Sequence, residues 1–159
     1  MTTLLEHDVC LYAPPKWVWG VLAAPPCTEF SRARRFHHYN REFKQALEVV
    51  SACMRIILTA QPIFWCLENP DEHLREWLGL PKMVFDPWHF GDPYQKKTAL
   101  WGEFNRPVRT VFKKPSNVKS FAYLRSREIY PEYKKELDRQ TRRSITPPGF
   151  AQAFFEANP

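Results

Sequence analysis

The sequence has few of the residues that build several common kinds of site. Only five glycines occur, and none lies before Gly20, so a glycine-rich turn that brings backbone close to a cofactor is absent from the N-terminal part. The four cysteines have no CxxC spacing, and the histidines have no ligand spacing. No apolar run reaches the roughly eighteen residues of a membrane span. We therefore expect no metal site, no disulfide framework, no membrane segment and a cytosolic location.

Aromatic residues, prolines and positive charge are, by contrast, abundant. Aromatic side chains make up 15% of the 159 residues, and there are fifteen prolines. The net charge of +6 is concentrated between Arg106 and Arg143, where twelve Lys/Arg face four Asp/Glu. This field predicts a phosphate-binding surface; the alternative is an ordinary solvated helical face. The length suits one compact fold, with a core over residues 1–105 and a basic segment with a C-terminal helix over residues 106–159.

Hydrophobic periodicity predicts an α/β fold. Residues 17–24 and 63–67 are short apolar runs that end at Pro-Pro and Glu-Asn-Pro turns, as buried strands do. Between them, residues 41–60 place apolar side chains at steps of three and four, which indicates an amphipathic helix. Together these form a βαβ unit. Further elements are expected as a helix over 71–78, strands over 83–85 and 98–101, a helix over 130–142 and a helix that begins at Pro147-Pro148.

The stretch Pro25-Pro26-Cys27-Thr28-Glu29-Phe30-Ser31 is the most informative in the chain. Two prolines fix Cys27 just beyond a predicted strand, and three arginines follow within eight residues. A nearby positive field favours a thiolate, which is the nucleophilic form of cysteine. Taken alone, a cysteine is more often a small buried apolar residue. A second chemical group at the same place is needed to favour catalysis.

Glu68-Asn69-Pro70 provides that second group. It ends the next predicted strand, and if the two strands are parallel neighbours, both turns open at the same edge of the sheet. Zinc deaminases also carry a Pro-Cys motif, but they need a second cysteine three residues later, at position 30, where this chain has Phe30. The thiol of Cys27 and the carboxyl of Glu68 are therefore predicted to face one pocket.

The two turns resemble the signatures of the DNA cytosine-5 methyltransferase family. PPCTEFS is similar to its Pro-Cys nucleophile motif, and FWCLENP to its Glu-Asn motif. The resemblance implies a truncated Rossmann-like methyltransferase sheet with flanking helices. It also implies that Cys27 adds to C6 of a flipped cytosine, that Glu68 engages N3, and that C5 then takes a methyl group from S-adenosylmethionine. Pro26, Ser31, Arg34 and Asn69 would border the base or the DNA.

Weaker matches extend the resemblance over roughly residues 8–102. Asp8-Val9 resembles the site that contacts the cofactor's adenine, with Pro25 also near the cofactor, and FGDPYQKKTALWG resembles a DNA-contacting loop in which Lys96 and Lys97 supply charge. This loop departs from the family's pattern, because Tyr94 stands near the expected glutamine, Lys96 near the first arginine and Thr98 near the second. The glycine-rich cofactor turn and a long target-recognition domain are both missing.

These departures leave three readings open. The first is a bacterial or phage-encoded enzyme that acts on double-stranded DNA, either a minimal methyltransferase or the catalytic fragment of one whose cofactor-binding half lies on a second chain. The second is a catalytically inactive DNA-binding protein or partner subunit. The third is a remnant with a structural role. The absent turn favours the second reading, whereas the intact Cys27 and Glu68 turns favour the first, because a pure binding protein has no need for a thiol there.

Overall fold

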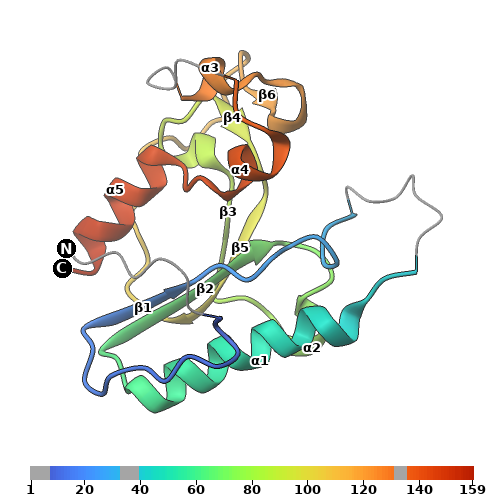
Figure 1. The fold of residues 1–159 in the computed structure, drawn as a ribbon. Helices are drawn as coiled ribbons and strands as arrows, with labels where there is room; N and C mark the ends of the chain where they lie inside the picture. The colour runs from blue at the N-terminus through green and yellow to red at the C-terminus, as the bar shows by residue number, and fades with distance from the viewer. Residues whose placement is uncertain (1–7, 33–39, 131–135) are drawn as a thin grey trace. The chain divides into compact units, whose positions relative to one another are not determined.

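The computed structural model describes residues 8–32, 40–130 and 136–159 and is an α/β protein, as the sequence predicts (Figure 1). One sheet has the strand order β1-β2-β5-β3. Its strands are β1 (Gly20–Ala23), β2 (Phe64–Pro70), β5 (Thr98–Glu103) and β3 (Met83–Phe85). Each of these strands overlaps one of the four expected from the sequence.

The chain divides into two compact units. Unit 1 comprises Met1–Met83 with Ala99–Phe104, and unit 2 comprises Val84–Thr98 with Asn105–Pro159. The stretch Val84–Thr98, which the sequence places in a core over residues 1–105, thus clusters with the basic segment and the C-terminal helix.

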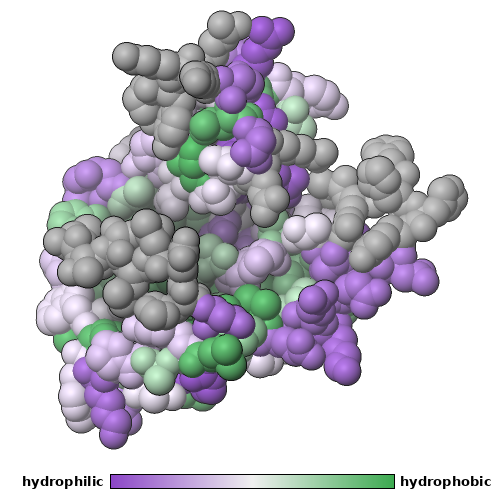
Figure 2. Space-filling model, in the orientation of Figure 1, coloured by the Kyte–Doolittle hydropathy of each residue, from purple (hydrophilic) through white to green (hydrophobic). Residues whose placement is uncertain are grey.

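Among the described residues no helix has both the length and the apolarity to cross a bilayer. On the visible face, apolar patches alternate with polar ones (Figure 2).

Helix α1 (Phe43–Ala60) connects β1 to β2 and completes the predicted βαβ unit. Val50, Cys53 and Ile57 are buried on its apolar face, as their spacing predicts. Leu58 was expected on the same face but is 73% exposed. It directly follows the buried Ile57, and one step along a helix turns a side chain by about 100°, which takes it off the stripe.

Strands β1, β2 and β5 lie side by side in the sheet, and a glycine allows β5 to approach β2 closely. Strands β1 and β2 pair in parallel, with Gly20 opposite Phe64 and Ala23 opposite Leu67. On the other side of β2, Gly102 of β5 has φ +145, and a Cβ there would lie 2.1 Å from the carbonyl oxygen of Trp65. Only glycine allows β5 to approach β2 this closely.

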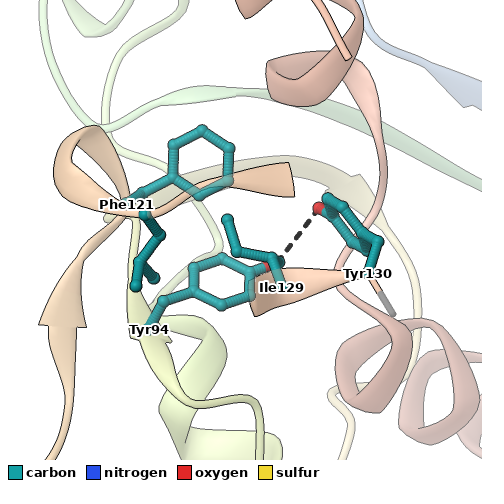
Figure 3. Close-up of a cluster of buried hydrophobic side chains, with 5 residues drawn as sticks. Tyr94, Phe121, Ile129 and Tyr130 are labelled. Atoms are coloured by element: carbon teal, nitrogen blue, oxygen red, sulfur yellow. Dashed lines mark hydrogen bonds between the residues drawn. The ribbon is translucent and has the colours of Figure 1, made fainter. Parts of the chain in front are cut away.

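Unit 2 contains two small clusters of buried rings. Phe85, Phe90 and Phe150 contact one another, and Phe85 stacks on Phe150 at a centroid distance of 4.1 Å. A second cluster comprises Tyr94, Phe121, Leu124, Ile129 and Tyr130, and the Tyr94 and Tyr130 hydroxyls lie 3.3 Å apart (Figure 3). The elements here are 3-10 helices η2 (Pro87–Phe90) and η3 (Phe121–Tyr123), strands β4 (Tyr94–Gln95) and β6 (Lys119–Ser120), and helices α3 (Ser126–Ile129), α4 (Arg139–Ser144) and α5 (Pro148–Ala157).

The single helix expected over residues 130–142 is wrong in its described part. Residues 136–138 are not helical, and α4 begins at Arg139; residues 131–135, with the predicted first-turn Pro131, lie outside the described residues. The Asp138 carboxylate accepts hydrogen bonds from the backbone N–H of Thr141, at 3.0 Å, and from its hydroxyl. An aspartate in this position caps a helix and fixes its start. The Ser126 hydroxyl also accepts the Leu137 N–H at 3.0 Å, which holds that backbone outside a helix.

His89 accepts a hydrogen bond that protonation of its ring would break. Its Nδ1 accepts a hydrogen bond from the Asp86 N–H at 3.2 Å, which requires an unprotonated Nδ1. Burial, and then the nearby Arg109, lowers the pKa of His89 below its ordinary 6.5. The unfolded chain therefore takes up this proton first as the pH falls. The contribution to stability is present above pH 6.5 and is lost as the pH falls through 6.5 to the lowered pKa.

We therefore expect the wild type to lose stability relative to His89→Gln as the pH is lowered from about 7 to about 5. Glutamine still offers an acceptor but does not titrate. Urea unfolding at several pH values measures the difference. Parallel pH profiles for the two proteins would show that His89 does not contribute the titration.

Candidate functional site

The two signature motifs lie on neighbouring strands of unit 1. Strands β1 and β2 are parallel neighbours, and the last residues paired between them are Ala23 and Leu67. The Pro-Pro-Cys turn follows β1, whereas Glu68, Asn69 and Pro70, which were expected to form a turn, are the last residues of β2. The condition that the sequence argument set, two parallel neighbouring strands, is therefore met.

Asn69 joins the two motifs. Its Nδ2 donates a 3.0 Å hydrogen bond to the carbonyl oxygen of Pro25, two residues before Cys27. The side chain is fully buried, and its Oδ1 is also buried, with no hydrogen-bond partner in the described part of the chain. The sequence predicted Asn69 beside the substrate and Pro25 near a cofactor; the structure adds a direct hydrogen bond between them.

Backbone hydrogen bonds and Phe30 hold the residues after Cys27 in a compact turn. The N–H groups of Phe30 and Ser31 both donate to the Cys27 carbonyl oxygen, at 3.2 and 2.9 Å. Phe30 is fully buried, and its ring lies 5.9 Å from that of Trp77 and 6.2 Å from that of Phe43. The phenylalanine of this motif is thus an anchor for the turn, a role that its sequence position did not reveal.

Charged side chains connect this turn to its neighbours. The Arg41 guanidinium donates to the carbonyl oxygens of Glu29 and Ser31, the second at 3.2 Å. The Glu29 carboxylate accepts the Glu42 N–H at 3.1 Å. From the segment after β2, the Glu72 carboxylate accepts the N–H of Arg32. The turn that contains Cys27 is therefore tied both to the start of α1 and to the segment that follows Asn69.

Cys27 and Glu68 are both half-buried, so each retains some access to solvent. The neighbouring Cys66, by contrast, is 4% exposed. Burial, followed by the Glu68 carboxylate, raises the pKa of the Cys66 thiol to about 12. Cys66 is therefore held as a neutral thiol near Glu68, and of the two cysteines nearest this edge only Cys27 suits a nucleophilic role.

The other predicted site residues are distributed more widely. Ser31 is buried in the turn, and Pro26 is exposed beside it. The Asp8 carboxylate accepts the Cys10 N–H at 2.9 Å, and the Val9 carbonyl accepts Arg55 at 3.2 Å, so this pair forms a turn tied to α1. Arg34 lies outside the described residues.

In unit 2, Lys96 and Tyr94 contribute to internal packing. The Lys96 ammonium donates a 2.7 Å hydrogen bond to the Arg143 carbonyl and lies 5.8 Å from the Phe121 ring centroid. Tyr94 is fully buried, and burial raises its pKa. Lys97 is exposed. Tyr94, which stands where the resemblance implies a glutamine, thus has a structural role, because its aromatic side chain fills the second ring cluster.

Comparisons with known proteins identify no family for this chain. No protein-family model matches the chain, and no curated protein matches it significantly. Within the described residues no group of three or more His, Cys, Asp or Glu side chains is arranged to hold a metal ion. The functional argument therefore depends on the two motifs and the contacts between them.

Asn69 gives a direct test of how the motifs are joined. Asn69→Ala leaves the Pro25 carbonyl without its donor, and we expect a loss of about 1–3 kcal/mol in the free energy of unfolding. Asn69→Asp places a buried carboxylate against that carbonyl, and we expect a larger loss of about 3–5 kcal/mol at neutral pH. Urea unfolding measures both, with the exposed Asn117→Asp as the control. Equal stability of all three variants would contradict the role assigned to Asn69.

Proposed function

We propose that the chain is a DNA cytosine-5-methyltransferase-like protein with a truncated Rossmann-like sheet, in which Cys27 and Glu68 activate a flipped cytosine. One observation carries the proposal: the Pro-Pro-Cys turn follows β1, the Glu-Asn pair ends the parallel neighbouring strand β2, and Asn69 is hydrogen-bonded to Pro25. Two motifs separated by forty residues are thereby brought to one edge of the sheet.

The chemistry needs a nucleophile and an acid on the same ring. The Cys27 thiolate adds to C6 of cytosine, and negative charge develops toward N3 and C5. Glu68 stabilises this charge by engaging N3, which is the task of a positioned general acid. The base must leave the duplex stack for a thiol to reach C6. The carbon C5 is then nucleophilic and can take a proton or a methyl group.

Asn69 supports the same assignment as a positioning residue, because it is fully buried and holds the turn that carries Cys27 against the strand that carries Glu68. The Nδ2 of the same side chain already holds the Pro25 carbonyl, so the residue is fixed whether or not a base is bound.

The described residues fit the cytosine better than they fit the methyl donor. Asp8 and Val9 are engaged in a turn against α1, and the sequence has no glycine-rich turn before Gly20. We therefore assign cytosine activation to this chain and binding of S-adenosylmethionine to a second chain. An inactive DNA-binding protein is the alternative, favoured by the same missing turn.

Exchange of the C5 hydrogen of cytosine tests this function without a cofactor. Addition of the Cys27 thiolate at C6 lets C5 take a deuteron from heavy water; loss of the original C5 hydrogen then expels the thiolate and restores the cytosine. We expect the chain to catalyse this exchange in duplex DNA, measured by mass spectrometry of the released nucleosides. An exchange rate equal to that of DNA alone would favour the inactive alternative.

A further inference from the structure

A segment of unit 2 combines strong positive charge with exposed aromatic rings. Between Asn105 and Arg127 the sequence has no aspartate or glutamate. It has seven positively charged residues: Arg106, Arg109, Lys113, Lys114, Lys119, Arg125 and Arg127. We call residues 105–127 the basic strip. Two carboxylates contact the strip near its end: Glu128 is paired with Lys119 at 3.7 Å, and Glu136 accepts a hydrogen bond from the Ser126 N–H at 2.8 Å.

Hydrogen bonds attach the basic strip to the rest of unit 2. The N–H groups of Thr110 and Val111 both donate to the His89 carbonyl, at 3.0 Å. The Lys114 ammonium donates to the Gln95 side chain at 2.6 Å, and β6 at Lys119 pairs in parallel with β4. These contacts hold the strip between Thr110 and Lys119. Its charges are therefore presented by a folded surface of unit 2.

Two aromatic rings of the basic strip point away from the core. Phe112 is 81% exposed and Tyr123 is 85% exposed, whereas Phe121, between them in the sequence, is buried in the ring cluster of Figure 3. Rings exposed to this extent can be covered by a partner, and removing their apolar surface from water would favour binding. Their position within a run of cations indicates the chemistry of that partner.

We infer that the basic strip binds single-stranded DNA. Its cations neutralise phosphates, and Phe112 and Tyr123 stack on the faces of unpaired bases. In a duplex those faces are already covered by neighbouring base pairs, so the rings would gain little there. The inference rests on the proposed function only in taking DNA, and not RNA, as the ligand. It adds that unit 2 binds the single-stranded form.

Fluorescence anisotropy of the full chain tests this inference. Cys27→Ser protein is titrated against a labelled single strand, its duplex and the RNA of the same sequence, so that no covalent chemistry contributes. We expect the DNA single strand to bind roughly tenfold more tightly than the duplex. Phe112→Ala and Tyr123→Ala should each weaken single-strand binding by roughly tenfold and leave duplex binding unchanged. Phe155→Ala, which removes a ring that is 70% exposed outside the strip, is the matched control.

Salt dependence supplies a second readout. Single-strand affinity should fall with salt, and the slope of log K against log salt should become shallower by about 0.7 for each contacting cation removed, as in Arg109→Ala and Lys113→Ala. Preference for the duplex, tighter binding to RNA, or no effect of the two ring variants would each overturn the inference. If the chain binds single strands but does not catalyse C5 exchange, only the proposed function is overturned. If the chain catalyses C5 exchange but Phe112→Ala and Tyr123→Ala bind single strands normally, only the inference is overturned.

Discussion

Replacement of Cys27 by serine is expected to abolish C5 exchange and to leave the fold intact. A serine hydroxyl is almost isosteric with the thiol but is a far weaker nucleophile at neutral pH, so addition to C6 should stop. The turn itself should persist, because the Cys27 carbonyl, the buried Phe30 ring and Arg41 hold it, and serine keeps all three contacts. Exchange measured beside circular dichroism separates these two effects.

Cysteines elsewhere in the chain provide the controls. Cys10 is exposed, and Cys10→Ser should exchange at the wild-type rate. Cys66→Ser alters the buried thiol beside Glu68 and should lower stability while leaving exchange measurable. Unfolding of Cys27→Ser, or undiminished exchange by it, would remove Cys27 from the mechanism.

Replacement of Glu68 by glutamine is expected to slow C5 exchange by about 10²–10⁴-fold. The amide keeps the size of the side chain and can still contact N3, but it cannot transfer a proton there. The loss should fall on the rate at saturating DNA more than on affinity, because the charge that Glu68 stabilises develops only during addition. Single-turnover exchange at several DNA concentrations makes that separation.

A second acid serves as the matched control for this variant. Glu48 is an exposed carboxylate of α1, and Glu48→Gln should leave exchange unchanged. If Glu68→Gln exchanged within a factor of about two of the wild type, Glu68 would be a structural residue of the strand end rather than a catalytic acid.

The elements that position the site could be predicted from sequence because their signals are local. The periodicity of residues 41–60 gave α1 almost to the residue, and the apolar runs before Pro25 and Glu68 gave β1 and β2. Parallel pairing of those strands follows from the connecting helix, which places both motifs at one edge.

Long-range contacts could not be predicted in the same way. Nothing near Asn69 in the sequence indicates that its amide binds the carbonyl of Pro25, forty-four residues earlier. The grouping of Val84–Thr98 with the C-terminal part depends on Phe85 stacking on Phe150 and on Tyr94 meeting Tyr130, pairs that only the fold brings together. The interruption before α4 likewise depends on Ser126, eleven residues from Leu137.

Cross-linking between positions 27 and 68 tests the common pocket most directly. In a Cys10→Ser, Glu68→Cys protein the two thiols of interest are Cys27 and the introduced one, because Cys53 and Cys66 are buried. A bifunctional thiol reagent about as long as a pyrimidine ring is wide should join them within one chain, and cytosine-containing DNA should slow the reaction. Modification of each thiol separately, with no joined peptide in the mass spectrum, would contradict a shared pocket for Cys27 and Glu68.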